Sequence, residues 1–425
     1  MYRYHQATSR FLSLIMALSL FTVSACAQNA SKEAKSNGEA NASTLKHYDI
    51  KLTDLPPPEV QRGPVNFSKV IPRPEGAQLQ MPAGFSVIEY ATDLAKPRWL
   101  ALAPNGDVFV SESEANRIIV LRDTNKDGKA DERFTFAEGL ARPFGMAFWN
   151  NYFYTGNTNA VTRYKYKAGQ TKAEGAAEKL IDLPMNGYRE HWTRNILFSP
   201  DSKKLYVTVG SKTNVDAGEE PMRAAITEIN ADGTGQRLYA SGLRNPLRLA
   251  FNPTTKQLWA AVQERDLIGN DLVPDYVTSV KDAGFYGWPY SYIGSNIDPR
   301  RKGERDDLAK TAIVPDVLLQ AHSAVLGLVF YEGKMFPSDY QGDAFAALHG
   351  SWNRDKRTGY KIIRIRFKNG KPVGGYDDFI TGWMLGEDRP EVWGRPVGLL
   401  VLQDGSMLIA DDGGNKIWRV SYQAR

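Results

Sequence analysis

Six short units of the same form follow one another along this chain, and they restrict the possible folds more than any other feature of the sequence. Each unit is an apolar strand, a turn rich in Gly, Asn or Asp, and a second apolar strand, as in residues 99–112 with their Pro-Asn-Gly-Asp turn. The first strands start near Trp99, Gly145, Ile196, Leu249, Gly327 and Gly398. Their mean spacing of about 60 residues is typical of internal-repeat architectures.

The repeated units predict a ring of small sheets. Each unit fits one four-stranded antiparallel sheet, which cannot bury both of its faces alone and therefore needs neighbours. From residue 84 onward, no long window shows helical periodicity. We therefore predict an all-β fold, a six-bladed β-propeller over residues 81–425. A pair of β-sandwiches is the alternative, but it does not explain six similar units. Loops that join blades meet at one end of the channel, where we expect the chemistry.

The N-terminus has the form of an export signal. Arg3 and Arg10 precede an apolar run over residues 11–23, which is short for a membrane span but has the length of a signal-peptide core. Small residues then lead to Cys26, a pattern that resembles the lipobox of bacterial lipoproteins. We predict a lipoprotein signal peptide over residues 1–25 and a lipid anchor on Cys26, with an ordinary secretory signal as the alternative. The protein is then exported to the periplasmic side of a bacterial membrane. Ala27 resembles the sorting signal for the outer membrane.

Composition limits the remaining partners. One cysteine in 425 residues excludes an intramolecular disulfide and a zinc site built on several thiolates. The formal net charge is +5, but residues 1–80 hold nine Lys and Arg against six Asp and Glu. The rest of the chain is close to neutral, which argues against a nucleic-acid partner. Residues 26–80, rich in Ala, Ser, Asn, Lys and Pro, are typical of a flexible tether and an extended arm.

One segment carries the spacing of a calcium loop. The oxygen-bearing side chains at its positions 1, 3, 5 and 9 are Asp123, Asn125, Asp127 and Asp131. Gly128 at position 6 allows the sharp turn, but position 12 is Phe134 and no helix is predicted on either side. We predict a calcium-binding hairpin with a structural role. A solvated Asp/Asn turn is the alternative.

Three histidines occur from residue 84 onward, and His191 has the surroundings best suited to catalysis. Glu190 beside it and Arg194 near it form a charged segment that leads into the third unit, where a histidine can act as a general base. His322 is the next candidate. The sequence lacks G-x-S-x-G, H-E-x-x-H, P-loop and G-x-G-x-x-G motifs, so serine hydrolase, zincin, NTPase and Rossmann functions lose support.

Arginine and aromatic residues gather in the segments that connect the units. They surround positions Arg244, Trp288, Trp352 and Arg395. Fixed cations that converge on a channel mouth suit a multiply anionic ligand, and tryptophan and tyrosine rings supply stacking faces. Blade-closing salt bridges and hydrophobic wedges are the alternative for any single arginine. The set together favours a planar polyanion.

At these residues the chain resembles the PQQ-dependent soluble sugar dehydrogenases, the glucose and sorbosone dehydrogenases built on six-bladed propellers. The most specific stretch is Gly-Leu-Arg-Asn-Pro…Leu-Ala-Phe-Asn-Pro over residues 242–253, followed by Gly-Phe-Tyr-Gly-Trp-Pro over residues 284–289. The residues around His322 and over 349–354 are closer to the sorbosone branch. The resemblance covers the chain from residue 84 to its end, and it implies PQQ and Ca²⁺ as cofactors.

The resemblance also implies roles for individual residues. His191 matches the catalytic base of the family. Arg244 and Asn245 match the pair that holds the reactive quinone edge, so Arg244 is expected to be both catalytic and cofactor-binding. The main-chain carbonyls of Glu264 and Arg265 fall where the family binds calcium.

Further cofactor contacts are implied at the ends of the units. Arg395 matches an arginine that binds a cofactor carboxylate. Arg142 stands where glucose dehydrogenases carry a glutamine that binds substrate. The family's cofactor lysine has no clear match here, and His349 or Arg354 is expected to replace it, with Trp352 beside them.

The implied reaction is the oxidation of an aldose, a sorbosone-like sugar or a related alcohol or aldehyde. A base takes the hydroxyl proton while the carbon delivers hydride to the quinone. Export fits an enzyme that passes its electrons to a respiratory acceptor. Two other classes compete. One is a calcium-dependent lactonase, which needs several carboxylate and Asn side chains on a channel metal. The other is a non-catalytic carbohydrate-binding lipoprotein.

Overall fold

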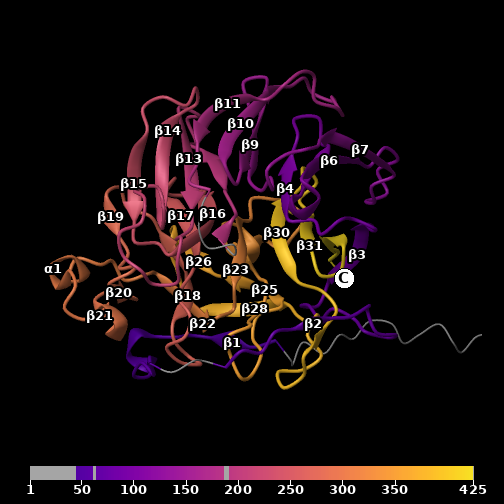
Figure 1. The fold of residues 1–425 in the computed structure, drawn as a ribbon. Coiled ribbons are helices and arrows are strands. Elements are labelled where there is room, and N and C mark those ends of the chain that lie inside the picture. The colour runs from indigo at the N-terminus through magenta and orange to yellow at the C-terminus, as the bar shows by residue number, and fades with distance from the viewer. Residues whose placement is uncertain (1–44, 61–63, 186–190, 425) are drawn as a thin grey trace, which may run out of the picture. The chain divides into compact units, whose positions relative to one another are not determined.

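The regular structure of the chain is almost entirely β-strand. A computed structural model describes residues 45–60, 64–185 and 191–424. Among these residues one short α-helix occurs, α1 (Asp306–Ala309). Figure 1 shows the strands arranged as separate small sheets around a common centre.

The first three sheets follow the order of the chain. Blade 1 consists of β4 (Trp99–Leu102), β5 (Val108–Glu112), β6 (Arg117–Arg122) and β7 (Glu132–Ala137). Blade 2 consists of β8 (Met146–Trp149), β9 (Tyr152–Asn157), β10 (Ala160–Lys165) and β11 (Glu178–Asp182). Blade 3 consists of β12 (Ile196–Phe198), β13 (Lys204–Val209), β14 (Ala225–Asn230) and β15 (Arg237–Ser241), with β19 (Gly284–Phe285) added in parallel.

The other three sheets include strands that are separated from their neighbours by long stretches of the chain. Blade 4 consists of β16 (Asn245–Phe251), β17 (Leu258–Gln263), β18 (Pro274–Ser279) and β22 (Val317–Ala321). Blade 5 consists of β23 (Val325–Phe330), β24 (Ala344–Leu348), β25 (Lys361–Ile365) and β28 (Tyr376–Ile380), with β1 (His47–Tyr48) at its edge. Blade 6 consists of β30 (Pro396–Val401), β31 (Met407–Asp411), β32 (Lys416–Tyr422) and β3 (Phe85–Ala91).

Three two-stranded pairs complete the regular structure of the described residues. They are β2 (Lys69–Val70) with β29 (Glu391–Val392), β20 (Ser291–Tyr292) with β21 (Asn296–Ile297), and β26 (Phe367–Lys368) with β27 (Lys371–Pro372). Short 3₁₀ turns lie at Leu52–Asp54, Ser113–Ala115, Pro299–Arg301 and Ser338–Tyr340.

The six sheets close into a ring. The first strand of each blade contacts the first strand of the next, and β30 of blade 6 contacts β4 of blade 1. Blade 6 closes the ring by combining strands from both ends of the propeller sequence. Its outer strand β3 pairs with β32 in the register Phe85↔Tyr422 and Val87↔Val420. The predicted six-bladed β-propeller is confirmed. All six predicted first strands are the innermost strands of their blades.

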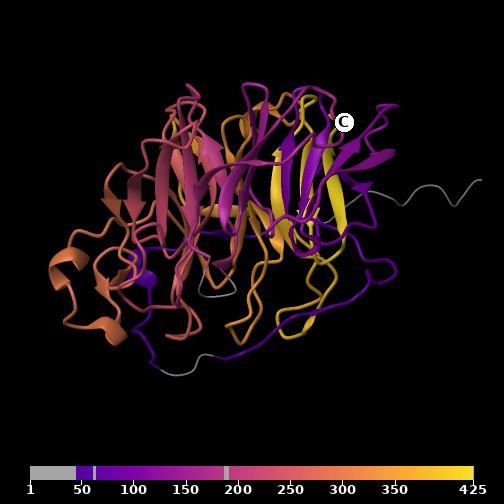
Figure 2. The same cartoon turned by 45° about the horizontal axis from the view of Figure 1, so that its top comes forward.

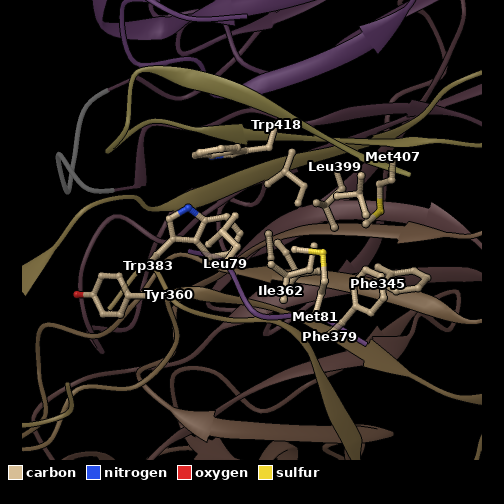
Figure 3. Packing of buried hydrophobic residues seen from close by; sticks show 14 of the residues in the cluster. Leu79, Met81, Phe345, Tyr360, Ile362, Phe379, Trp383, Leu399, Met407 and Trp418 are labelled. Atoms are coloured by element: carbon tan, nitrogen blue, oxygen red, sulfur yellow. The ribbon is translucent and has the colours of Figure 1, made fainter. Parts of the chain in front are cut away.

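The core fills the space between neighbouring blades. Between blades 5 and 6, Phe345 and Ile362 pack with Trp383 and Trp418 in one buried cluster (Figure 3). The same cluster includes Leu79 and Met81, which precede β3 in the chain. They are 7% and 6% exposed. Large aromatic rings are suited to this position because they bury much apolar surface in a wedge between two twisted sheets.

Strand direction decides which residues meet at each end of the ring. The four main strands of each blade pair in antiparallel fashion, so the starts of the first and third strands lie at the same end as the ends of the second and fourth. We call this end of the ring the site end. Residues 45–60 and 64–80 form an extended arm, most of which is drawn in indigo below the strands in Figure 2. Main-chain bonds from Glu59 to Ile268 and from Asn66 to Trp352 attach the arm to loops of blades 4 and 5.

Candidate active site

The site end contains a small cavity that is partly open to solvent. Its lining residues are His191, Arg244, Gln263, Glu264, Asp266, Asp275, His322, Ala324 and Trp352. These residues belong to blades 3, 4 and 5 and lie far apart in the sequence. The fold therefore gathers four of the predicted site residues, namely His191, Arg244, Glu264 and Trp352, around one space.

The surroundings of His191 determine its protonation state. The ring Nδ1 lies 2.9 Å from the Ser211 carbonyl oxygen and 3.0 Å from Ser211 Oγ. The Ser211 hydroxyl donates its own proton to the Thr213 carbonyl at 2.6 Å, so both neighbours of Nδ1 are acceptors. Nδ1 therefore carries the proton and Nε2 is the basic nitrogen. Burial, followed by the nearby charge of Arg244, holds the pKa of His191 well below its usual range. His191 is a neutral base at physiological pH.

Arg194 fixes the backbone that carries this base. Its Nη1 donates to the carbonyls of His191 and Thr193 at 3.0 and 2.9 Å, and its Nη2 donates to the Pro184 carbonyl at 2.6 Å. Burial lowers the pKa of Arg194 to about 9. Carbonyl bonds of this kind offset part of the cost of burying a cation. The position of His191 thus depends on a buried guanidinium.

Arg244 lies immediately before β16 and is held by oxygen atoms on several sides. It donates to the Glu264 carbonyl at 2.6 Å, to Asn214 Oδ1 at 2.9 Å and to Asp266 Oδ2 at 3.1 Å. Although burial opposes ionisation, the charge of Arg244 keeps the pKa of Asp266 below its usual value. A guanidinium fixed in this way presents a constant positive charge beside His191.

His322 extends the charged network beyond Asp266. Its Nδ1 lies 3.3 Å from Asp266 Oδ1, and its Nε2 lies 3.0 Å from the Gly269 carbonyl. Burial opposes the charged form, but the hydrogen bond to Asp266 raises the pKa of His322 above its usual value. Both ring nitrogens therefore act as donors, which leaves no basic nitrogen for catalysis.

Three further side chains place oxygen atoms in or beside the cavity. Asn245 Oδ1 and Glu264 Oε1 are both buried without a hydrogen-bond partner among the described residues. Asp275 accepts from the backbone N–H of Glu264 at 2.9 Å and of Ala324 at 2.6 Å. Burial raises the pKa of Asp275 to about 7. Unpartnered buried oxygens are costly and indicate a site for a cation or donor group.

A second charged cluster lies at the site end between blades 1, 5 and 6. Asp412 accepts from His349 Nε2 at 2.8 Å and forms an ion pair with Arg98. Arg395 donates from Nε to the His349 carbonyl at 3.3 Å. Burial, and then the charge of Arg395, lower the pKa of His349 to about 4. His349 is therefore a neutral donor to Asp412, and the cluster as a whole remains positively charged.

Two arginines of the site end have no anionic partner. Within the described residues, neither Arg142 nor Arg395 forms an ion pair with a carboxylate. The Arg142 guanidinium lies over the Trp192 ring at 4.4 Å, and Arg98 lies over the same ring at 5.4 Å. Both unpaired arginines are half-buried. This arrangement leaves two guanidinium groups that can form charge-assisted bonds to an anionic ligand.

Two predicted residues direct their side chains elsewhere. Arg265 is fully buried and bonds to Glu264 Oε2 at 2.9 Å and to Asp298 at 3.2 Å, so it ties blade 4 to the loop before α1. Arg354 donates to the Asn270 carbonyl at 2.8 Å and pairs with Asp271 at 2.6 Å. Arg354 therefore connects two loops of the site end and does not line the cavity.

The predicted calcium loop lies at the other end of the ring, because it joins the third and fourth strands of blade 1. Its carboxylates bond to the backbone of the loop. Asp123 accepts from the Gly128 N–H at 2.9 Å and Asp127 from the Lys129 N–H at 2.8 Å. No set of three His, Cys, Asp or Glu side chains is arranged to hold a metal ion anywhere in the described part of the chain. Calcium binding here stays a prediction, and it concerns a place distant from the cavity.

Several residues of the site end were not predicted from the sequence. They are Arg98, Trp192, Gln263, Asp266, Asp275 and Asp412. A signal for Arg98 was present, because Arg98 directly precedes the first strand of blade 1 as Arg395 precedes that of blade 6. No comparable signal marked Asp412 or Asp266, since their importance depends on partners far away in the sequence.

The predicted signal peptide, Cys26 and the first part of the tether lie outside the described residues. Among residues 45–60, 64–185 and 191–424, no helix combines the length and the apolar composition needed to cross a membrane.

Comparison with protein families gives one match over most of the chain. The profile of a family described as TrAA12-like matches residues 79–275 and 292–423. The match starts at Leu79, where the chain enters the core between blades 5 and 6. An uncharacterized protein of Borreliella burgdorferi is 29% identical over 360 residues, which cover 81% of this chain and 91% of that protein.

Solved structures share the fold at low sequence identity. An iodide structure of the Trichoderma reesei carbohydrate-active enzyme of family AA12 superposes with a TM-score of 0.72 and 20% identity, over 84% of this chain and 100% of that one. The holo form of the PQQ domain of pyranose dehydrogenase from Coprinopsis cinerea gives 0.67 and 19%, over 82% and 98%. The PQQ-bound aldose sugar dehydrogenase of Streptomyces coelicolor gives 0.58 and 19%, over 81% and 100%.

Proposed function

This chain belongs to the TrAA12-like family, and from that premise we propose that it is a quinoprotein oxidoreductase that uses PQQ and Ca²⁺ to oxidise a sugar. Two of the structures with the same fold contain PQQ or its binding domain and act on a pyranose or an aldose by name. The observation that carries the proposal is the neutral His191, whose Nε2 is the basic nitrogen, in a cavity beside the fixed cation Arg244.

The site end has the chemistry that PQQ requires. PQQ is a planar quinone with several carboxylate groups, so it needs cations without anionic partners and flat apolar faces. Arg142 and Arg395, which form no ion pair among the described residues, provide such cations, and the ring of Trp352 provides a face in the cavity. Arg244 and Asn245 lie deeper, where they would contact the quinone edge.

Calcium would be held by oxygen atoms on the cavity side of blade 4. The main-chain carbonyls of Glu264 and Arg265 are the predicted ligands. The unpartnered Asn245 Oδ1 and Glu264 Oε1 add two oxygens of the type that Ca²⁺ prefers. Because Asn245 and Glu264 leave these atoms buried and unsatisfied, a bound cation would remove a cost that the protein otherwise bears.

The chain's own residues would perform the proton transfer. His191 Nε2 would accept the hydroxyl proton of the substrate. PQQ, when bound, would supply the acceptor for the hydride from the carbon that carries this hydroxyl. The carboxylate of Asp266 favours the charge that then appears on His191. Arg244 keeps its orientation through three oxygen partners, so its charge is in place before the reaction starts.

The substrate class that we propose is an aldose, a sorbosone-like sugar or a related alcohol or aldehyde. The sequence likeness around residues 349–354 supports the sorbosone branch. We also propose that the protein is an exported lipoprotein anchored through Cys26, and that a respiratory carrier accepts its electrons. The apolar run at residues 11–23 and the single cysteine support export.

Equilibrium binding tests the proposal. PQQ is titrated into the purified protein with and without Ca²⁺, and quenching of tryptophan fluorescence reports binding near Trp192. We expect saturable, calcium-dependent binding. Arg395→Ala should weaken it about ten- to a hundredfold, the worth of one charge-assisted bond to a carboxylate. Arg305→Ala is the matched control, since Arg305 is exposed and, within the described part of the chain, its ion pair is with Asp307. Absence of saturable PQQ binding to the wild-type protein would overturn the proposal.

A further inference from the structure

One aromatic side chain of the described residues is placed against the usual rule of burial. Phe67 is 67% exposed, whereas every other phenylalanine and tryptophan in the described part of the chain is buried or half-buried. An exposed phenylalanine gives up the stabilisation that burial of its ring would provide. Its position therefore calls for a compensating role.

The backbone around Phe67 is held firmly. The Asn66 N–H donates to the Trp352 carbonyl at 2.7 Å, and the Asn66 side chain donates to the Asp355 carbonyl at 2.6 Å. Arg357 donates to the Asn66 carbonyl at 2.6 Å and to the Phe67 carbonyl at 3.1 Å. Asn353 donates to the Pro64 carbonyl at 3.0 Å. Such a dense set of bonds holds the backbone that carries the exposed ring in one place, which is unusual for a surface segment.

Phe67 continues the wall of the cavity outward. Its ring stacks on that of Trp352 with centroids 5.5 Å apart and an angle of 11° between the planes. Trp352 lines the cavity that contains His191. Phe67 belongs to the extended arm, which is indigo in Figure 2. The arm thus adds an aromatic ring to the rim of the site formed by the propeller loops.

The groups around this ring are polar. Asp355 and Lys356 are exposed beside it, and Asn270 bonds to Asp355 at 2.7 Å. A sugar ring has the matching character, because it presents C–H groups on one face and hydroxyls at its edge. The C–H groups are attracted to the negative face of an aromatic ring, and the hydroxyls bond to polar neighbours.

We propose that Phe67, stacked on Trp352, forms a subsite for a second sugar ring, so that the preferred substrate is an oligosaccharide whose reacting ring occupies the cavity. The proposal rests on the sugar oxidation proposed above and names its substrate class. It assigns Phe67 a role in specificity and none in the chemical step.

Substrate length is the variable that tests the subsite. The kcat/KM values are measured for glucose, maltose and maltotriose and for the cellulose- and xylose-based series. The wild-type protein should prefer two or more rings in at least one series. Phe67→Ala should lower kcat/KM for that oligosaccharide about five- to tenfold, the usual worth of one stacking contact, and leave the monosaccharide within about twofold. Phe67→Trp should restore the preference.

Val65→Ala is the matched control, since Val65 is 62% exposed in the same arm and should not affect any substrate. Equal activity on one and more rings, or an equal effect of Phe67→Ala on both, would overturn the subsite. A second readout needs no turnover, namely binding of the oligosaccharide to the cofactor-free protein by calorimetry. If Phe67→Ala weakens this binding but no sugar is oxidised, the subsite stands and the oxidoreductase proposal fails. If sugars of every length are oxidised equally well, the oxidoreductase proposal stands and the subsite fails.

Discussion

Replacing His191 by asparagine separates the basic nitrogen from the rest of the side chain. The Asn amide N–H₂ can occupy the place of His191 Nδ1 and donate to the Ser211 carbonyl, which lies 2.9 Å from that atom. The bond from Arg194 to the His191 carbonyl is made by the main chain and is retained. His191→Asn therefore removes Nε2 with little else, and we expect a loss of stability of only about 1 kcal/mol.

The expected loss of turnover follows from the role of Nε2. A general base contributes about 10²–10⁴-fold, so kcat should fall by that factor, which corresponds to about 2.7–5.5 kcal/mol in the barrier. PQQ affinity should change little, because the cations of the site remain. The pH profile adds a second test. The wild-type acid limb should lie well below pH 6.5, in line with the lowered pKa of His191, and it should disappear in the variant.

The assay is dye reduction by the PQQ-loaded protein with the best available sugar, together with a PQQ titration of each variant. A turnover of His191→Asn above about one third of the wild-type value would refute the assignment. Loss of a general base that contributes at least 10²-fold must lower turnover far more than threefold. His322 would not rescue the reasoning, because both of its ring nitrogens already donate to acceptors.

Three other perturbations test the surrounding structure. The folded-state pKa of His349 is about 4 and lies below its unfolded value of about 6.5, so the unfolded chain binds more protons between these values and stability falls as the pH falls. His349→Gln should remove about 2 kcal/mol of that dependence between about pH 5 and pH 7.5, measured by urea unfolding at both pH values. An unchanged difference between the two pH values would contradict the depressed pKa. Arg194→Met removes the donor to three carbonyls, so it should lower the free energy of unfolding by about 3 kcal/mol. It should also lower kcat more than it raises KM. An effect on KM alone would contradict the positioning role of Arg194. Removal of Ca²⁺ by chelation should lower the free energy of unfolding by about 2.7 kcal/mol, relative to the protein at a Ca²⁺ concentration of a hundred times Kd. Asp127→Ala should leave the affinity for PQQ intact. An unchanged Tm after confirmed removal of Ca²⁺ would contradict both calcium sites.

Local patterns in the sequence were sufficient to predict the repeated part of the fold. Strand, turn and strand are neighbours in the chain, so the innermost strands from Trp99 to Pro396 could be located by alternation and turn residues. The closure of the ring could not be predicted in the same way. Phe85 pairs with Tyr422 across almost the whole chain, and alternation in a strand does not specify its partner.

The same distinction applies to the site. Arg244 and Arg395 were identifiable because each directly precedes the first strand of a blade, and His191 because it lies in the segment that leads to β12. Family motifs also lie at these places. The His349–Asp412 pair was not identifiable, because no sequence spacing relates its two members. Phe67 was missed for a related reason, since a tether-like composition gives no indication that the arm is bound to the loops of blades 4 and 5.

Anaerobic reduction of the bound cofactor by sugar tests the central proposal most directly. The protein is loaded with PQQ and Ca²⁺, mixed with an excess of an oxidisable sugar in the absence of dye, and followed by absorbance in the region of the bound quinone. We predict a single exponential change that corresponds to one equivalent of PQQ per chain, with a rate about 10²–10⁴-fold lower in His191→Asn. Saturable PQQ binding without any sugar-dependent change, over aldoses, sorbosone-like sugars and oligosaccharides alike, would contradict it.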